Sequence, residues 1–393
     1  MQTISSSDKE IYLDNSATTP LEDPVREKMT RASYVYGNPS SLHSAGLAAE
    51  KLVSEARAQV LAALGVRGAK AEELVFCASG TEANNLALAG TAYAKKRRAR
   101  TKIITDDSEH PSVLRTLERL SEDGFEIIKI PTAGGVLDLA ALERAADDRV
   151  LLASFMLVNN ETGALYDVKR AFSIVKRASS EAVTHCDAVQ GFLKVKFSPA
   201  SLGADLVTVS SHKIHGPKGA GALYIHPDVI RAKKIVPVTL GGGQEHGFRS
   251  GTENTICIAG FGEAAKIGCE GFERDSALMK ELRDGLAQKL SELDLKLNLP
   301  PVSAPHILSV TLPNVKSETM LHFLSSEGIF VSSGSACSSH SGKPSATLLA
   351  FGLSPAEADH TLRISLSHMN TRADVDALAS ALEAGLSRLA KTK

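Results

Sequence analysis

The order of apolar and polar segments along this chain predicts an α/β fold. Short apolar runs rich in Val, Ile and Leu alternate with longer segments whose apolar residues recur at helical spacing, as in residues 44–64. Such alternation is typical of a mainly parallel, doubly wound sheet with helices on both faces. The predicted strands of this sheet are residues 74–77, 102–105, 126–130, 150–158, 183–186 and 206–209.

A different pattern begins near residue 255. A long helical segment, residues 255–295, leads into a mixture of strands and helices that ends with a helix predicted for residues 373–389. We therefore expect a large sheet domain over residues 15–260. A smaller α+β domain would combine residues 1–14 with residues 261–393.

Polar residues follow each predicted strand of the large domain. Ligands of doubly wound sheets bind beyond the carboxyl ends of the strands, so these residues are candidates for one site. Small hydroxyl residues and a glycine at a helix start can seat a phosphate, because free backbone N–H groups point there. The polar groups are residues 79–82, 108–110, 159–163, 185–190 and 210–213.

The combination of these groups points to a cofactor. Asp187 can pair with a protonated pyridine nitrogen, His110 can stack on a ring, and Lys213 can form an imine. With a phosphate seat, these are the groups that pyridoxal 5′-phosphate requires. Each residue also has a structural interpretation: Asp187 as a helix N-cap, His110 as a partly buried histidine with its bonds satisfied, and Lys213 as a solvated lysine.

Two further candidates lie in the second domain. Cys337 stands among hydroxyl residues and glycines in a predicted loop, about residues 332–345, which favours an exposed nucleophile over a buried structural thiol. His340 either helps to ionise that thiol or is an ordinary solvated loop histidine. Arg363 lies in a predicted strand and requires an anion, supplied by the protein or by a substrate.

Composition and charge exclude several classes of function. The 393 residues carry a formal net charge of −1, which argues against a nucleic-acid partner. No apolar run reaches membrane-spanning length, and residues 1–7 lack the features of a signal peptide. The five cysteines form no Cys-x-x-Cys pair and are odd in number, which argues against a disulfide framework or a zinc site. We expect a cytoplasmic protein with no membrane partner.

A series of short motifs runs in order along nearly the whole chain, at residues 12–20, 37–41, 81–82, 109–110, 158–161, 187–190, 211–219, 249–252 and 332–337. Together they resemble the cysteine desulfurases, the NifS/IscS-like group of the class-V aminotransferases, which are pyridoxal-phosphate enzymes of fold type I. The resemblance implies a large domain with a seven-stranded sheet. It also implies conversion of L-cysteine to L-alanine, with the sulfur held as a persulfide on Cys337.

The resemblance also implies a role for each candidate residue. Lys213 would carry the cofactor and then remove the Cα proton of the substrate, and Thr252 would reach the cofactor of a second subunit in a homodimer. Cys337 would pass sulfur to an iron–sulfur scaffold or another acceptor, as in tRNA thiolation, and would contact an iron–sulfur cluster only transiently, so no resident metal is expected. The implied catalytic residues are Lys213, Cys337 and His110; the cofactor residues are Gly80, Thr81, His110, Asn160, Asp187, Gln190, Ser210, His212, Lys213 and Thr252; the residues for the substrate carboxylate are Asn160 and Arg363.

The chain departs from the family pattern at three places. Ala78-Ser79-Gly80 replaces the usual Ser-Gly-Ala of the phosphate turn, Leu240 stands where a histidine is usual, and Val189 replaces a common threonine. None of these changes removes a catalytic group. Two alternatives stay open: a selenocysteine lyase or other β-eliminating relative with the same cofactor, and a non-catalytic assembly scaffold of the same fold.

Overall fold

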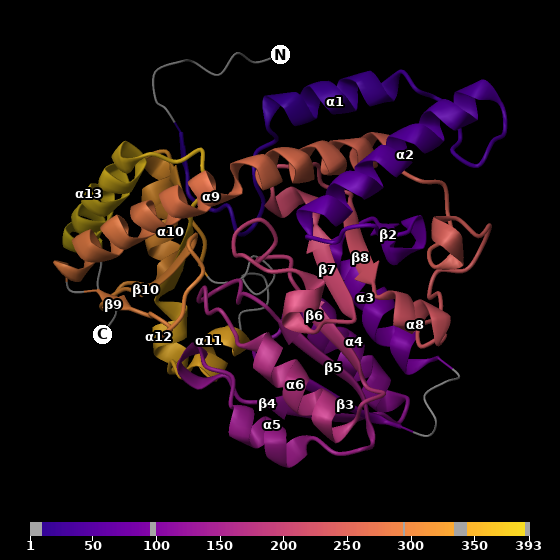
Figure 1. Cartoon of the computed structure of the whole chain (residues 1–393). Helices are drawn as coiled ribbons and strands as arrows, with labels where there is room; N and C mark the ends of the chain where they lie inside the picture. The colour runs from indigo at the N-terminus through magenta and orange to yellow at the C-terminus, as the bar shows by residue number, and fades with distance from the viewer. Residues whose placement is uncertain (1–9, 95–99, 294, 334–343, 390–393) are drawn as a thin grey trace.

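A seven-stranded sheet forms the centre of the computed structural model, which describes residues 10–94, 100–293, 295–333 and 344–389 (Figure 1). The strand order is β2-β8-β7-β6-β5-β3-β4, and β8 runs antiparallel to its two neighbours while the other neighbouring pairs are parallel. The prediction of a mainly parallel seven-stranded sheet is confirmed. The strands are β2 (Leu74–Cys77), β3 (Lys102–Asp106), β4 (Glu126–Ile130), β5 (Val150–Met156), β6 (Val183–Asp187), β7 (Leu206–Ser210) and β8 (Gly221–Ile225).

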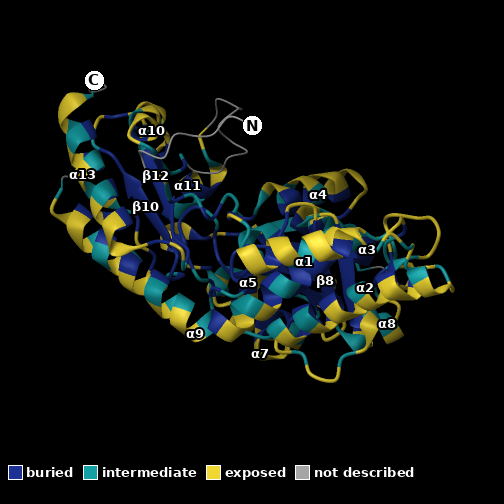
Figure 2. Ribbon diagram, turned by 90° about the horizontal axis from the view of Figure 1, so that it is seen from above, coloured by how far each residue is buried: buried dark blue, intermediate teal, exposed yellow. Residues whose placement is uncertain are grey.

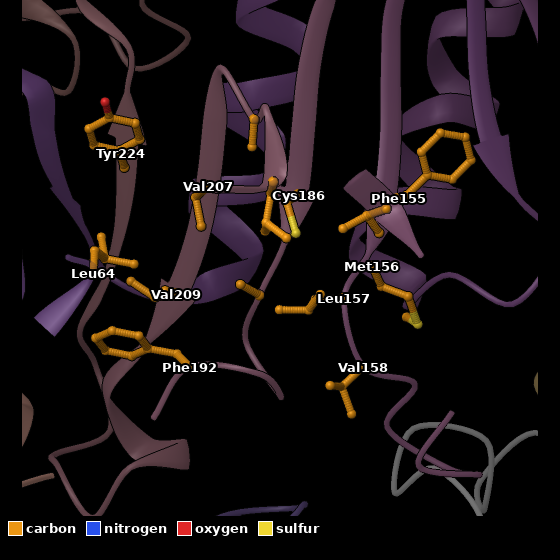
Figure 3. Close-up of a cluster of buried hydrophobic side chains, with 14 of the residues drawn as sticks. Leu64, Phe155, Met156, Leu157, Val158, Cys186, Phe192, Val207, Val209 and Tyr224 are labelled. Atoms are coloured by element: carbon orange, nitrogen blue, oxygen red, sulfur yellow. The ribbon is translucent and has the colours of Figure 1, made fainter. Parts of the chain in front are cut away.

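Helices cover both faces of this sheet. Successive strand residues point to opposite faces, so Tyr224 packs into one core and Leu223 into the other. Figure 3 shows part of the first core, where Leu64 lies near Val207 and Val209 of β7. The helices that enclose these cores are α1 (Asp23–Ser33), α2 (Ser44–Ala63), α3 (Gly80–Ala92), α4 (Pro111–Glu122), α5 (Leu139–Ala145), α6 (Val168–Ala178), α7 (Pro199–Leu202) and α8 (Pro227–Arg231).

A second, smaller unit has its own apolar core. Its three-stranded antiparallel sheet has the order β12-β10-β9, and a parallel pair, β1 and β11, lies beside it. The core joins leucines of these strands to leucines of the surrounding helices. The elements are β1 (Ile11–Tyr12), β9 (Lys296–Leu297), β10 (Ile307–Thr311), β11 (Ile329–Phe330), β12 (Thr361–Ser365), α10 (Ser317–Ser326), α11 (Ala346–Phe351), α12 (Pro355–Asp359) and α13 (Arg372–Arg388).

One long helix, α9 (Thr255–Ser291), joins the two units. Its first part, with Ile258 and Phe261, packs into the core of the large sheet, and its last part, with Leu286 and Leu290, packs into the smaller core. Figures 1 and 2 show it extending from α2 towards α13. The predicted boundary between residues 260 and 261 falls inside this helix and stays a prediction.

Two differences from the predicted strands of the large sheet have a clear cause. Strand β8 was not foreseen, because the glycines before it suggested only a turn. Strand β5 ends at Met156 instead of Val158, since Val158 leaves the sheet and pairs with Leu165. Among the described residues, no helix has the length and apolar content needed to cross a lipid bilayer.

Candidate active site

A cavity of about 280 Å³ opens at the carboxyl ends of β5, β6 and β7. Its wall combines these strand ends with the start of α3, the residues before α4, the segment after β1, and β12 of the smaller unit. Every predicted site residue that the structure describes, apart from Thr252, lies on it. The lining residues are Ser16, Ala17, Ser79, Gly80, Thr81, Asn84, His110, Ser112, Met156, Val158, Asn160, Asp187, Val189, Gln190, Ser210, His212, Lys213 and Arg363.

Lys213 ends a single helical turn, η4 (Ser211–Lys213), directly after β7. Its Nζ donates hydrogen bonds to the backbone carbonyls of Ser16 and Ala17, the latter at 2.9 Å. A second tie to this segment comes from Gln190, whose Nε2 donates to the Ser16 carbonyl at 2.9 Å. The lysine is therefore held at the cavity wall and not extended into solvent, which rejects the solvated interpretation.

Asp187 is the last residue of β6, and both of its carboxylate oxygens are engaged. Oδ1 accepts from the backbone N–H of Val189 at 3.0 Å, and Oδ2 accepts from Asn84 Nδ2 at 2.7 Å. Turns and no helix directly follow Asp187, so the N-cap interpretation is wrong. The departure at Val189 leaves this contact intact, since a backbone amide provides it.

His110 precedes α4 and caps its first turn. Its Nδ1 lies 3.1 Å from the backbone nitrogen of Ser112 and 2.8 Å from Ser112 Oγ. Burial lowers the pKa of His110; the carboxylate of Asp187 opposes this shift, and the ammonium of Lys213 adds to it. The ring of His110 therefore caps a helix and also lines the cavity, and its stacking on a cofactor ring stays a prediction.

The phosphate seat is predicted at the start of α3, which lines the cavity. Ser79 is the N-cap and accepts a hydrogen bond from the Glu82 amide at 3.1 Å, so Gly80 and Thr81 occupy the first helical turn. A Cβ atom at Gly80 would lie 3.0 Å from Val189 Cγ2, which explains the glycine. The departure Ala78-Ser79-Gly80 thus retains both a cap and a close-approach glycine.

Ser210 and His212 lie on the opposite side of this seat, around the end of β7. Ser210 Oγ is buried and has no hydrogen-bond partner among the described residues. His212 contacts Thr18 Oγ1 at 3.2 Å through Nδ1, and burial together with Lys213 and Lys218 lowers its pKa to about 4. A buried hydroxyl without a partner requires an additional polar group, and an anion held by α3 would supply one.

Arg363 brings the smaller unit to the cavity. The guanidinium donates to the carbonyl of Asn160 at 3.0 Å and to Asp14 Oδ1 at 2.8 Å, while its Nε is buried without a partner among the described residues. Only 3% of the arginine side chain is exposed. The anion that the sequence called for therefore includes a protein carboxylate, Asp14, which the sequence analysis did not assign.

The segment that contains Cys337, residues 334–343, lies outside the described residues. Ser332 and Ser345, on its two sides, are held next to the wall of the cavity. Ser332 exchanges two backbone hydrogen bonds with Arg363, at 2.7 and 3.1 Å. Ser345 Oγ donates to Glu161 Oε2 at 2.6 Å, next to Asn160.

Thr252 lies outside the cavity, on an exposed part of the loop that follows residue 239. Two ion pairs hold this loop. The buried Glu245 binds both Nη atoms of Arg57, at 2.8 and 2.9 Å, and Arg249 pairs with Glu82 at 2.9 Å. In the single chain, this loop therefore positions Thr252 away from its own site.

The sequence analysis missed several residues that shape the site. Asn84 and Ser112 link Asp187 to His110 by hydrogen bonds, and Asp14 binds Arg363. Asn84 could have been found as a polar residue on an apolar helix face. Ser112 could have been found as a serine two residues after a histidine that caps a helix. Asp14 lies in the motif at residues 12–20, but the sequence does not show which residue it binds.

Comparison with known proteins decides the family. The aminotransferase class-V family matches residues 11–378, most of the chain. The chain belongs to the aminotransferase class-V family. Pyridoxal 5′-phosphate is therefore the cofactor of this class-V protein, and the cavity fits it: a lysine, a strand-end aspartate and a helix start with an unpartnered hydroxyl opposite are present together.

Individual class-V relatives are similar over almost their full length. "Cysteine desulfurase IscS 1" of Archaeoglobus fulgidus is 35% identical over 382 residues, which cover 96% of this chain and 97% of the relative. Among solved structures, a NifS-like protein has a TM-score of 0.89 and 36% identity, with 97% of this chain and 100% of that chain covered. A structure titled "SspA in complex with cysteine" has a TM-score of 0.79 and 31% identity, with 92% and 100% covered.

Proposed function

We propose that this class-V protein is a cysteine desulfurase that converts L-cysteine to L-alanine and holds the sulfur as a persulfide on Cys337 for transfer to an acceptor. The observation that carries the proposal is the single cavity that joins Lys213, Asp187 and Arg363. Relatives named cysteine desulfurase and a neighbour solved with cysteine support the substrate.

The cavity residues divide between the two ends of the cofactor. Asp187 would pair with the ring nitrogen, and its two fixed oxygens keep the carboxylate in one orientation. Gln190 and Asn160 would face the ring hydroxyl, and Lys213 would form the covalent link. Bound pyridoxal 5′-phosphate supplies an electron sink for charge that develops at Cα of an amino acid. The phosphate would be held by Gly80, Thr81, Ser210 and His212.

Arg363 and Lys213 would act on the amino acid itself. Arg363 binds the substrate carboxylate through the guanidinium hydrogens that Asp14 and the Asn160 carbonyl leave available. This contact orients the substrate, so that Cα faces the amine of Lys213. Once released from the cofactor, Lys213 takes the Cα proton as a general base.

Cys337 would collect the sulfur. Its thiolate attacks the sulfur of the substrate, the carbon–sulfur bond breaks with its electrons going to the carbon side, and a persulfide forms on Cys337. A proton added at Cβ and the return of a proton from Lys213 to Cα then give L-alanine. Ser332 and Ser345, which flank the cysteine segment, are held beside Arg363 and Glu161, and this supports access of Cys337 to the cavity.

A homodimer would complete the site. Thr252 is exposed in the single chain and lies away from its own cavity, so its predicted contact with the cofactor phosphate would be made in a second subunit. Large apolar side chains on the loop between α1 and α2 support such an interface, since Tyr34, Tyr36 and Leu42 are each at least 79% exposed. We also propose a cytoplasmic location, because the four described cysteines are unpaired thiols.

One experiment tests the proposed function. The purified protein, loaded with pyridoxal 5′-phosphate, is incubated with L-cysteine, and alanine and alkylated persulfide on Cys337 are quantified by mass spectrometry. We expect both products from the wild type, whereas Cys337→Ser should bind the cofactor but deliver no sulfur. Pyruvate and sulfide without persulfide on Cys337 would favour a β-lyase, and a protein that binds no cofactor would favour an assembly scaffold.

A further inference from the structure

The hydrogen bonds around His110 determine which of its ring nitrogens carries the proton. His110 caps α4, and its Nδ1 receives the backbone N–H of Ser112 at 3.1 Å. A backbone amide can only donate, so Nδ1 must offer its lone pair. The proton of the neutral imidazole is then on Nε2, the nitrogen that does not cap the helix.

A second chain of hydrogen bonds leads to the same result from the other side of the cavity. The ionised carboxylate of Asp187 can only accept, so the group of Asn84 that faces it at 2.7 Å is the amide NH2. The same nitrogen donates to Ser112 Oγ at 2.8 Å. Because Ser112 Oγ accepts from Asn84, its own hydrogen is available for His110 Nδ1, 2.8 Å away.

We propose that His110 works as a neutral imidazole that presents Nε2–H to the cavity as a hydrogen-bond donor and does not carry protons between reaction steps. Ser112 and Asn84 are positioning residues that hold this tautomer. A second proton on His110 would go to Nδ1, where it would face the Ser112 N–H and Oγ–H at hydrogen-bond distance. Proton transfer in the cavity is thereby left to Lys213, a consequence that rests on the proposed function; the tautomer itself does not.

The surroundings of the ring agree with a neutral state. Among the described residues, the charged groups that act on it are Asp187 at the end of β6, which favours the cation, and Lys213 on η4, which disfavours it. Burial, the largest effect, lowers the pKa of His110 further.

Two other histidines provide a comparison within the chain. His43 and His226 also cap helices through Nδ1, which accepts a backbone N–H at 3.2 Å in each case. The side chain of His226 is 42% exposed, and a carboxylate of Asp228 lies 3.8 Å from its Nδ1, in position to pair with a proton there. Beside Nδ1 of His110, the hydroxyl of Ser112 takes the place that the Asp228 carboxylate has beside His226.

The test is NMR spectroscopy of protein labelled with 15N-histidine, in which two-bond 15N–1H correlations distinguish protonated from unprotonated ring nitrogens. Loss of one signal set in His110→Gln assigns the residue. We expect an unprotonated Nδ1 and a protonated Nε2 in the wild type at neutral pH and still on the acid side of the ordinary histidine pKa of about 6.5. A protonated Nδ1 at neutral pH would overturn the proposal.

Two variants at one position isolate the backbone donor. Ser112→Ala removes the hydroxyl but keeps the N–H, so Nδ1 should stay unprotonated at neutral pH. Ser112→Pro removes both donors at a first-turn position where proline is tolerated, and the pKa of His110 should rise by about one unit relative to Ser112→Ala. Equal pKa values in the two folded variants would contradict the role of the N–H; if Ser112→Pro does not fold, the wild-type spectrum decides alone.

The outcome does not depend on whether the protein is a desulfurase. The spectra are recorded on cofactor-free and cofactor-loaded protein, and the cofactor-free spectrum alone reports the tautomer. An Nε2–H tautomer in a protein without desulfurase activity would leave this proposal intact and reject only the proposed function.

Discussion

Asp14→Asn is expected to destabilise the protein and to tighten the binding of a substrate carboxylate. In the wild type, Asp14 Oδ1 accepts from Arg363 Nη2 at 2.8 Å, and the arginine side chain is only 3% exposed. Asparagine retains an oxygen acceptor of similar shape but loses the negative charge. Arg363 would then keep a buried positive charge that no carboxylate neutralises.

The magnitude follows from burial. Removing one member of a buried ion pair typically costs 3–5 kcal/mol, because the remaining charge stays desolvated. The Asp14 side chain is 19% exposed, so we expect the lower end, about 3 kcal/mol of unfolding free energy. Asp23→Asn is the matched control: its pair with Arg26 is exposed at both ends, and its loss should cost less than about 1 kcal/mol.

Two assays measure these effects. Urea unfolding of the cofactor-free variants gives the change in free energy from the midpoints, provided that the slope is unchanged. Steady-state kinetics gives KM for L-cysteine, which should fall in Asp14→Asn because Arg363 is freed for the substrate carboxylate. If Asp14→Asn is as stable as Asp23→Asn and its KM is unchanged, the assignment of Asp14 as the counter-ion of Arg363 is refuted.

Other predictions concern buried charges away from this pair. Glu245→Gln should lower the unfolding free energy by about 3 kcal/mol, since it leaves Arg57 buried without its carboxylate; a loss below about 1 kcal/mol in urea unfolding would contradict this. Burial lowers the pKa of His185 to about 4. As the pH falls below about 6.5, the unfolded state therefore binds a proton that the folded state does not bind, and the protein loses stability. Between pH 7 and 5 this histidine should cost about 2 kcal/mol, and His185→Gln should reduce the measured pH dependence by that amount. An unchanged pH dependence in the variant would count against the buried neutral state.

The local pattern of apolar and polar residues was sufficient to predict most strands of the large sheet. Its strands are short, apolar and separated by amphipathic helices, and the residues that follow them were correctly expected at one edge. Strand β8 was not predicted, because Gly219 and Gly221 suggested a turn. The residues after them nevertheless pack alternately into the cores on the two faces of the sheet. Strand β5 was overextended at Val158, whose backbone pairs with Leu165 instead of continuing in the sheet.

The positions of Lys213 and Asp187 at the cavity were predictable, because each stands at or directly after the end of a strand. It was not predictable where two distant residues share one hydrogen bond. Asp14 and Arg363 are 349 positions apart, and Asn84 and Asp187 are 103 apart, so no periodicity or spacing connects them. Asp14 meets Arg363 where the segment after β1 pairs with β12, and Asn84 meets Asp187 where α3 packs against β6, so both contacts follow only from the folded structure.

The most direct test of the central claim is to locate the cofactor on the chain. The protein loaded with pyridoxal 5′-phosphate is reduced with borohydride, digested, and mapped by mass spectrometry for the lysine that carries the pyridoxyl group. Our account predicts modification of Lys213, with no such adduct and no alanine formation in Lys213→Ala. Modification of another lysine such as the exposed Lys218, or full turnover by Lys213→Ala, would contradict it.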